Sequence, residues 1–121
     1  MIVLATVVAG AFGAVTRYLI DGFVQDRYGD AFPWGTWVVN VTGSLALGIV
    51  TGLVLYHGLG DAPKAVVGTG FVGAYTTFST FGYETVRLAE EGSRYEAVLN
   101  AGASAAAGLL AGGAGLALAA L

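Results

Sequence analysis

The sequence contains no cysteine, one histidine, two prolines and few charged residues. The absence of cysteine excludes disulfides, thiolate chemistry and cysteine metal sites. Only 11% of the 121 residues are charged, against about a quarter in soluble domains. The five lysines and arginines are scattered and form no basic patch, which argues against nucleic-acid binding. No Ser–His–Asp set or metal-ligand cluster is present, so the sequence gives no support for an enzyme.

The charged residues leave four long charge-free intervals: 1–16, 31–60, 65–83 and 97–121. A transmembrane helix needs about 20 mostly apolar residues, whereas a soluble helix needs a polar outer face. We therefore expect an all-α, multi-pass membrane protein with a single transmembrane domain, residues 1–121. The expected transmembrane helices lie near residues 2–20, 34–56, 65–83 and 97–119.

The first apolar interval has an alternative interpretation as a cleaved signal peptide. It lacks a positively charged n-region, and further apolar spans follow it, so we expect it to remain as the first helix. Four spans place both termini on one side of the membrane. The loop cations that set orientation are few and weakly biased, so some molecules could insert each way up.

Residues 68–83, GTGFVGAYTTFSTFGY, are the most informative segment of the chain. Their first six letters match the dinucleotide fingerprint G-x-G-x-x-G. That fingerprint has meaning only between a strand and a helix of a βαβ unit. Here it lies in an apolar span of a chain too short for a dinucleotide-binding domain, so we expect no nucleotide binding.

The same segment places hydroxyl groups at four of five successive positions: Thr76, Thr77, Ser79 and Thr80. Such side chains can hydrogen-bond to the carbonyl four residues earlier and so hide from lipid. Four together exceed that need, and with the preceding glycines they weaken the helix. We expect a break near residues 73–76, where freed carbonyl oxygens would suit a small cation such as Na⁺.

Three apolar-span residues leave two interpretations open. Asn40 either makes an interhelical hydrogen bond or donates to a polar path. Phe78 and Phe81 share one helical face, which is typical of lipid or core contacts. The edge of an aromatic ring is also weakly positive, so the two rings could instead face an anion. A conducting site must release its ion easily, which a fixed cation would hinder.

The spans contain no central Asp or Glu, which disfavours proton-coupled antiporters and rotary-ring subunits. Arg17 and Glu84 lie at the expected span ends, where long side chains reach water. Small residues recur at packing intervals in the second and fourth spans, including Gly48, Gly52 and Gly112. Because four short helices enclose little polar space, we expect an oligomer.

The sequence resembles the small bacterial and archaeal fluoride channels of the CrcB or Fluc family. The resemblance covers nearly the whole chain and is carried by three motifs: residues 13–18 (GAVTRY), 35–44 (GTWVVNVTGS) and 70–81 (GFVGAYTTFSTF).

The resemblance implies a fluoride-selective channel in the cell membrane that lets fluoride leave the cell passively. It also implies an antiparallel, dual-topology homodimer with a broken third helix. By residue, it implies a fluoride pathway through Asn40, Phe78, Ser79, Thr80, Phe81 and Ser104. It places Arg17 and Glu84 at the vestibule and pore end, and a structural, untransported Na⁺ on the backbone carbonyls of Gly73 and Thr76. Two alternatives remain: a structural or assembly membrane protein, and a small-solute transporter.

Overall fold

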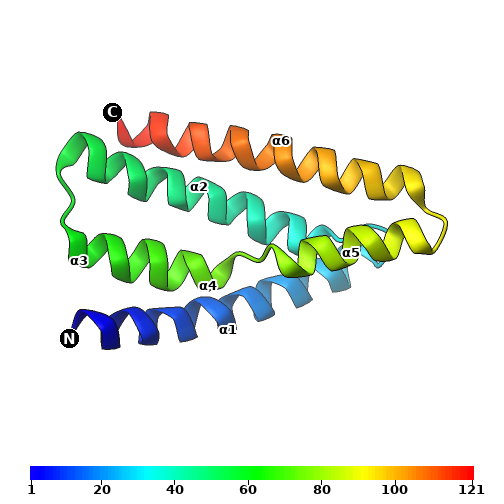
Figure 1. Ribbon diagram of the computed structural model, residues 1–121, viewed down its shortest axis with the longest axis horizontal. Helices are drawn as coiled ribbons and strands as arrows, with labels where there is room; N and C mark the ends of the chain where they lie inside the picture. Colours follow the sequence, from blue (N-terminus) through cyan, green and yellow to red (C-terminus); the bar gives the residue numbers. More distant parts are fainter.

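A computed structural model describes the whole chain, residues 1–121. It contains helices and no strands, and its helical units lie along the long axis of the molecule (Figure 1). The two termini lie at the same end, as expected for an even number of spans. The prediction of an all-helical protein is confirmed.

Three helices are long and apolar enough to cross a membrane: α1 (Ile2–Tyr28), α2 (Trp34–His57) and α6 (Arg94–Ala119). The remaining unit is divided into α3 (Asp61–Pro63), the π-helical η1 (Lys64–Val72), α4 (Gly73–Tyr75) and α5 (Ser79–Glu90). Residues 76–78 interrupt it, so neither half is long enough to span alone. The chain is therefore a membrane protein of four helical units with a broken third.

Two helix ends differ from those expected. The helix α1 continues to Tyr28 rather than ending near residue 20, and the third unit continues through α5 to Glu90 rather than ending near residue 83. The charged residues in these extensions suggested connections between spans, the second of them compatible with a helix. They extend helices instead, because side chains such as Asp26 and Arg27 are exposed at a helix end and carry their charges away from the apolar interior.

Glycine makes two of the turns possible. Gly58 ends α2 in the left-handed conformation (φ 67°, ψ 32°), and the N–H of the next residue, Leu59, donates to the carbonyl of Leu53 at 3.1 Å. Gly92, with φ 85°, forms the turn between α5 and α6. Other residues rarely adopt this region. These turns fold the chain back on itself with short connections.

The helix α2 packs most extensively against α6, and α1 packs against η1. Small residues allow the close approach of α2 and α6. A Cβ atom at Gly48 would overlap the carbonyl of Gly112, and one at Gly115 would overlap that of Leu45. The predicted small-residue packing face is confirmed. Gly115 extends it by one turn.

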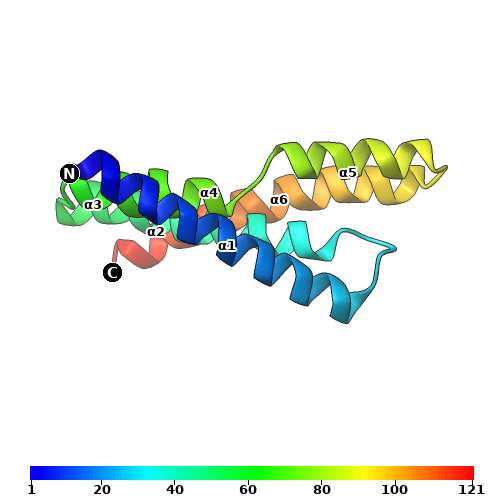
Figure 2. The ribbon, with the colours of Figure 1, turned by 90° about the horizontal axis from the view of Figure 1, so that it is seen from below.

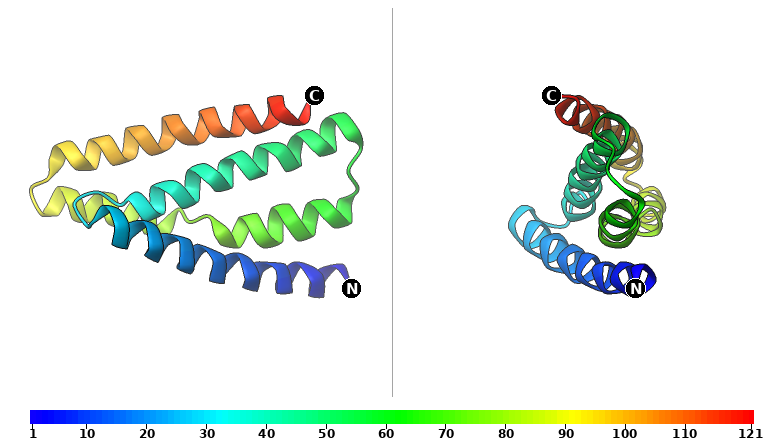
Figure 3. Two further views of the ribbon diagram at one scale, coloured as in Figure 1. Left: turned by 180° about the vertical axis from the view of Figure 1, so that it is seen from behind. Right: turned by 90° about the vertical axis from the view of Figure 1, so that its left-hand side faces the viewer.

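The helix α2 occupies the middle of the molecule, between α6 on one side and α1 with η1 on the other (Figure 3). Beyond the interruption, α5 changes neighbours and lies along α6, while the end of α1 diverges from this pair (Figure 2). The interruption thus lies where the third unit passes from α1 to α6.

Candidate functional site

The centre of the candidate site is the interruption at Thr76, Thr77 and Phe78. Thr76 is extended, with φ −82° and ψ 161°, and α5 begins three residues later. The break was expected near residues 73–76, but Gly73 is helical, with φ −59° and ψ −40°. The glycines therefore do not form the break themselves. They lie before it, in η1 and α4.

Asn40 of α2 holds the break open. Its amide Nδ2 donates to the carbonyl of Thr77 at 2.7 Å, and its Oδ1 accepts the Thr77 N–H at 2.8 Å. In a continuous α-helix that N–H would donate to the carbonyl of Gly73. The side chain of Asn40 therefore replaces a helical hydrogen bond. This matters in a membrane, where water does not satisfy an exposed peptide group.

The interhelical hydrogen bond predicted for Asn40 is confirmed, whereas donation to a polar path stays a prediction. The amide nitrogen carries a second N–H beyond the one used on Thr77. Asn40 also lines a hollow of about 240 Å³ together with Ser44, Thr76 and Phe78. The pairing leaves the Gly73 carbonyl without the Thr77 donor.

The four hydroxyl groups of residues 76–80 differ in their hydrogen-bond partners and in their exposure. Thr76 donates to the carbonyl of Val72 at 3.1 Å, which is the back-bonding expected of a threonine in lipid. Thr77 accepts the N–H of Thr80 at 3.2 Å and so caps the first turn of α5. Ser79 and Thr80 are exposed. Only part of the hydroxyl set is thus used to satisfy the backbone.

Phe78 directly precedes α5, and Phe81 lies in the first turn of that helix. Their ring centroids are 5.8 Å apart and the rings are tilted by 52°. Phe78 is 81% exposed and Phe81 is half-buried. Phe78 therefore has almost no packing role within its own chain, and its ring borders the hollow at Asn40.

A second hollow of about 150 Å³ lies on the α1 side of the break. It is lined by Arg17 and Asp21 of α1, Thr36 of α2, and Thr77 and Thr80 of the third unit. Thr77 borders both hollows. The break therefore separates two hollows. The one on the α1 side is lined by charged side chains, and the one at Asn40 is not.

Arg17 does not simply extend from a span end toward water. Its guanidinium donates to the carbonyl of Thr76 at 3.3 Å, because α1 continues well beyond it and crosses the break. Glu84 accepts a hydrogen bond from the hydroxyl of Thr36. Arg17 lines the charged hollow, and Thr36, which also lines it, links Glu84 to the start of α2.

Sequence reasoning missed Asn100, which is 1% exposed on α6. Ser104 donates to its Oδ1 at 3.3 Å, and its Nδ2 donates to the hydroxyl of Thr85 at 2.8 Å. Thr85 in turn donates to the carbonyl of Phe81 at 2.8 Å. This chain of bonds ties α5 to α6 beneath Phe81. A lone asparagine in an apolar span was the available signal.

Of the predicted pathway residues, Asn40 and Phe78 line one hollow, and Thr80 lines the other. Phe81 and Ser104 are joined through the Asn100 hydrogen bonds, and Ser79 is exposed at the start of α5. No hollow of the single chain includes all six. Together they offer amide, hydroxyl and ring-edge groups and no carboxylate, which is a donor set for an anion.

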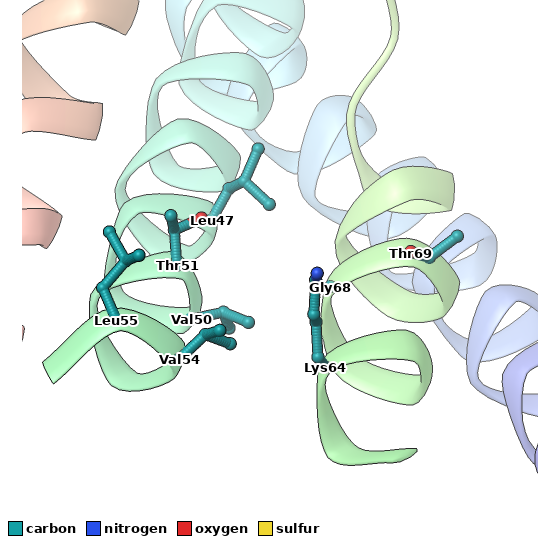
Figure 4. Close-up of a pocket in the computed structure, with 8 residues that line it drawn as sticks. All are labelled: Leu47, Val50, Thr51, Val54, Leu55, Lys64, Gly68 and Thr69. Carbon is teal, nitrogen blue, oxygen red and sulfur yellow. The ribbon is translucent and has the colours of Figure 1, made fainter. Parts of the chain in front are cut away.

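A third cleft of about 390 Å³ separates α2 from η1 toward the end that carries the termini (Figure 4). Lys64 of η1 faces α2 across it. Leu47 borders this cleft, the hollow at Asn40 and a further groove against α6. The α2 face of Ser44, Leu47 and Thr51, which we call the open face, is therefore not covered by the chain itself.

Comparison with known proteins places the chain in a family. A model of the CrcB-like protein family (Camphor Resistance, CrcB) matches residues 4–116. The fluoride-specific ion channel FluC 1 of Leifsonia xyli is 51% identical over 102 residues, covering 84% of this chain and 74% of that protein. FluC 1 of Streptomyces avermitilis is 50% identical over 111 residues, covering 91% of this chain and 90% of that protein. FluC 1 of Symbiobacterium thermophilum is 49% identical over 113 residues, covering 92% of this chain and 91% of that protein. The chain belongs to the CrcB-like family.

Proposed function

We propose that this protein is a fluoride-selective channel of the cell membrane that gives fluoride a passive path out of the cell and so lowers cytoplasmic fluoride. Relatives about 50% identical over most of the chain are fluoride-specific ion channels. The structural observation that carries the proposal is the break held open by Asn40, with exposed hydroxyl and phenyl groups beside it. The activity is ion transport, not enzymatic catalysis.

The fluoride route runs past the break, through Asn40, Phe78, Ser79, Thr80, Phe81 and Ser104. Fluoride is a small, strongly hydrated hydrogen-bond acceptor, so its dehydration requires closely spaced donors. The second N–H of Asn40 and the exposed hydroxyls of Ser79 and Thr80 supply them. The ring edges of Phe78 and Phe81 add weak positive potential without a fixed charge. A narrow path would reject larger halides, and the lack of carboxylates beside Asn40 would disfavour cations.

A second copy of the chain completes this route. Phe78, Ser79 and Thr80 are exposed in the single chain, and the open face of α2 carries hydroxyl groups. Polar groups at membrane depth are tolerated where they are buried in protein or line a path. The weak cation bias supports insertion in both orientations, because Arg27 and Arg94 lie toward one end and Lys64 toward the other. We infer an antiparallel homodimer.

The carbonyls of Gly73 and Thr76 are the proposed ligands of a structural Na⁺. Asn40 accepts the Thr77 N–H, which would otherwise donate to the Gly73 carbonyl. This supports the Gly73 carbonyl as a ligand. The Thr76 carbonyl accepts Arg17 but keeps a second lone pair. Two carbonyls are few for a cation, so the site requires both copies of an antiparallel pair. The bound ion would join the copies electrostatically.

The Na⁺ proposal predicts a change in stability. Replacing Na⁺ by N-methylglucamine at constant ionic strength should lower the Tm of the purified protein by several degrees, because the ion binds only the folded dimer. The measurement is thermal unfolding in detergent, followed by size-exclusion chromatography. Choline in place of N-methylglucamine should give the same decrease. An unchanged Tm in both Na⁺-free buffers would argue against the ion site.

Passive fluoride efflux from proteoliposomes tests the channel itself. A fluoride electrode should record rapid release when a potassium gradient with valinomycin compensates the charge, and no comparable release of chloride. A structural or assembly protein would give no efflux. A coupled small-solute transporter would give efflux that depends on a proton gradient. Either of these results would refute a passive fluoride channel.

A further inference from the structure

The hollow on the α1 side of the break contains one fixed cation and one fixed anion. Arg17 and Asp21 lie four residues apart on α1, so both face the same side of that helix. Thr77 and Thr80 also line this hollow, and Thr80 belongs to the proposed fluoride route. An anion that reaches the break from this side therefore passes both charges.

The position of Asp21 is set by the start of α2. A Cβ atom at Gly35 would overlap the Asp21 carboxylate, so glycine leaves room for it there. Gly35 lies in the first turn of α2, where the peptide dipoles favour a negative group. The α1–α2 contact thus holds the carboxylate at the edge of the hollow.

Asp21 and Arg17 do not form an ion pair. The one ion pair within 4 Å in the structure joins Arg87 and Glu91, and Arg17 is directed to the Thr76 carbonyl. Asp21 therefore leaves the guanidinium free to attract an anion while adding a negative potential to the same hollow. The Glu84 carboxylate, held by Thr36, lies close by and adds to that potential.

We propose that Asp21 limits how tightly fluoride is held beside Arg17 and thereby sets the fluoride concentration at which the channel saturates. A fixed cation alone would concentrate anions but retain them, and conduction requires an ion to leave as easily as it enters. Asp21 weakens the attraction by its charge, so fluoride moves on to Thr77 and Thr80. This inference rests on the proposed fluoride route. It makes Asp21 a residue at the entrance of that route that determines how fast fluoride passes.

The test compares neutral variants across a range of fluoride concentrations. Asp21→Asn and Asp21→Ser should each lower the half-saturating fluoride concentration about threefold, with a lower maximal rate, as expected for one unit charge across a partly hydrated hollow. Fluoride efflux or bilayer current at pH 7 gives both values. In about 1 M salt, where the Debye length is about 3 Å, the half-saturating fluoride concentrations of the variants should approach that of the wild type. A purely structural defect would not depend on salt in this way.

Asp26→Asn is the matched control, because Asp26 is an exposed carboxylate of the same helix outside the hollow. An equal decrease of the half-saturating fluoride concentration in this control would refute the proposal. An unchanged or higher half-saturating concentration in both neutral Asp21 variants would also refute it. The proposed route fails separately if wild-type protein releases no fluoride or if Phe78→Ile conducts normally. These results therefore distinguish a wrong entrance residue from a wrong route.

Discussion

Phe78→Ile is expected to lower fluoride efflux from proteoliposomes by about tenfold or more, which corresponds to a barrier increase of about 1.4 kcal/mol. Isoleucine keeps an apolar side chain but has no ring, so the positive edge beside the hollow at Asn40 is lost. Phe78 is 81% exposed, so the substitution removes almost no packing within the chain. The single chain should therefore fold like the wild type. Phe81→Ile should act in the same direction.

Phe12→Ile provides the control for this experiment. Phe12 is also highly exposed in an apolar span, but it lies on α1 and borders neither hollow. Its efflux should match that of the wild type in the fluoride-electrode assay. Normal efflux from both Phe78→Ile and Phe81→Ile would contradict the assignment of these rings to the route, even if the channel activity itself were confirmed.

Asn40→Asp is expected to reduce fluoride efflux even more, to near background. The aspartate carboxylate keeps the shape of the side chain and still accepts the Thr77 N–H, but it has no donor for the Thr77 carbonyl. It also places a negative charge beside the path, where an anion would be repelled in a medium of low dielectric. Efflux at neutral pH and the elution volume in size-exclusion chromatography are the two measurements.

Thr16→Val is the matched control for the Asn40 variant, because it also changes a polar side chain within a span. Its hydroxyl donates only to the carbonyl of Phe12 in its own helix, so the substitution leaves the break intact. Efflux from this control should be normal. If Asn40→Asp is dimeric and conducts like the wild type, then Asn40 neither shapes the break nor provides a donor to fluoride.

The sequence predicted the four spans, the interruption of the third and the small-residue face between α2 and α6. These features follow from composition and local pattern, which the sequence displays directly. The spans were predicted to end earlier than α1 and α5 do, because charged side chains such as Asp26 suggested connections, whereas an exposed helix end accommodates them. Helix boundaries depend on which face meets water, and that depends on the assembled bundle.

The site was predictable in its residues but not in its connections. The glycines and hydroxyl residues predicted a break near residues 73–76, and the structure places it at residues 76–78, because the deciding partner of Thr77 is Asn40, 37 residues earlier in the chain. Asn100 was missed for the same reason, because its partner Thr85 lies 15 residues earlier in the chain.

The hydrogen bonds between Asn40 and Thr77 also bear on how the protein is made. When the third unit enters the bilayer without α2 beside it, no side chain is available to replace the bond from Thr77 to Gly73, and water does not satisfy it in hydrocarbon. The least costly state of the newly inserted segment is then an unbroken helix. Helices first insert and then associate in the two-stage scheme of membrane-protein folding. The opening at residues 76–78 is therefore a product of helix association, created only when α2 delivers its asparagine.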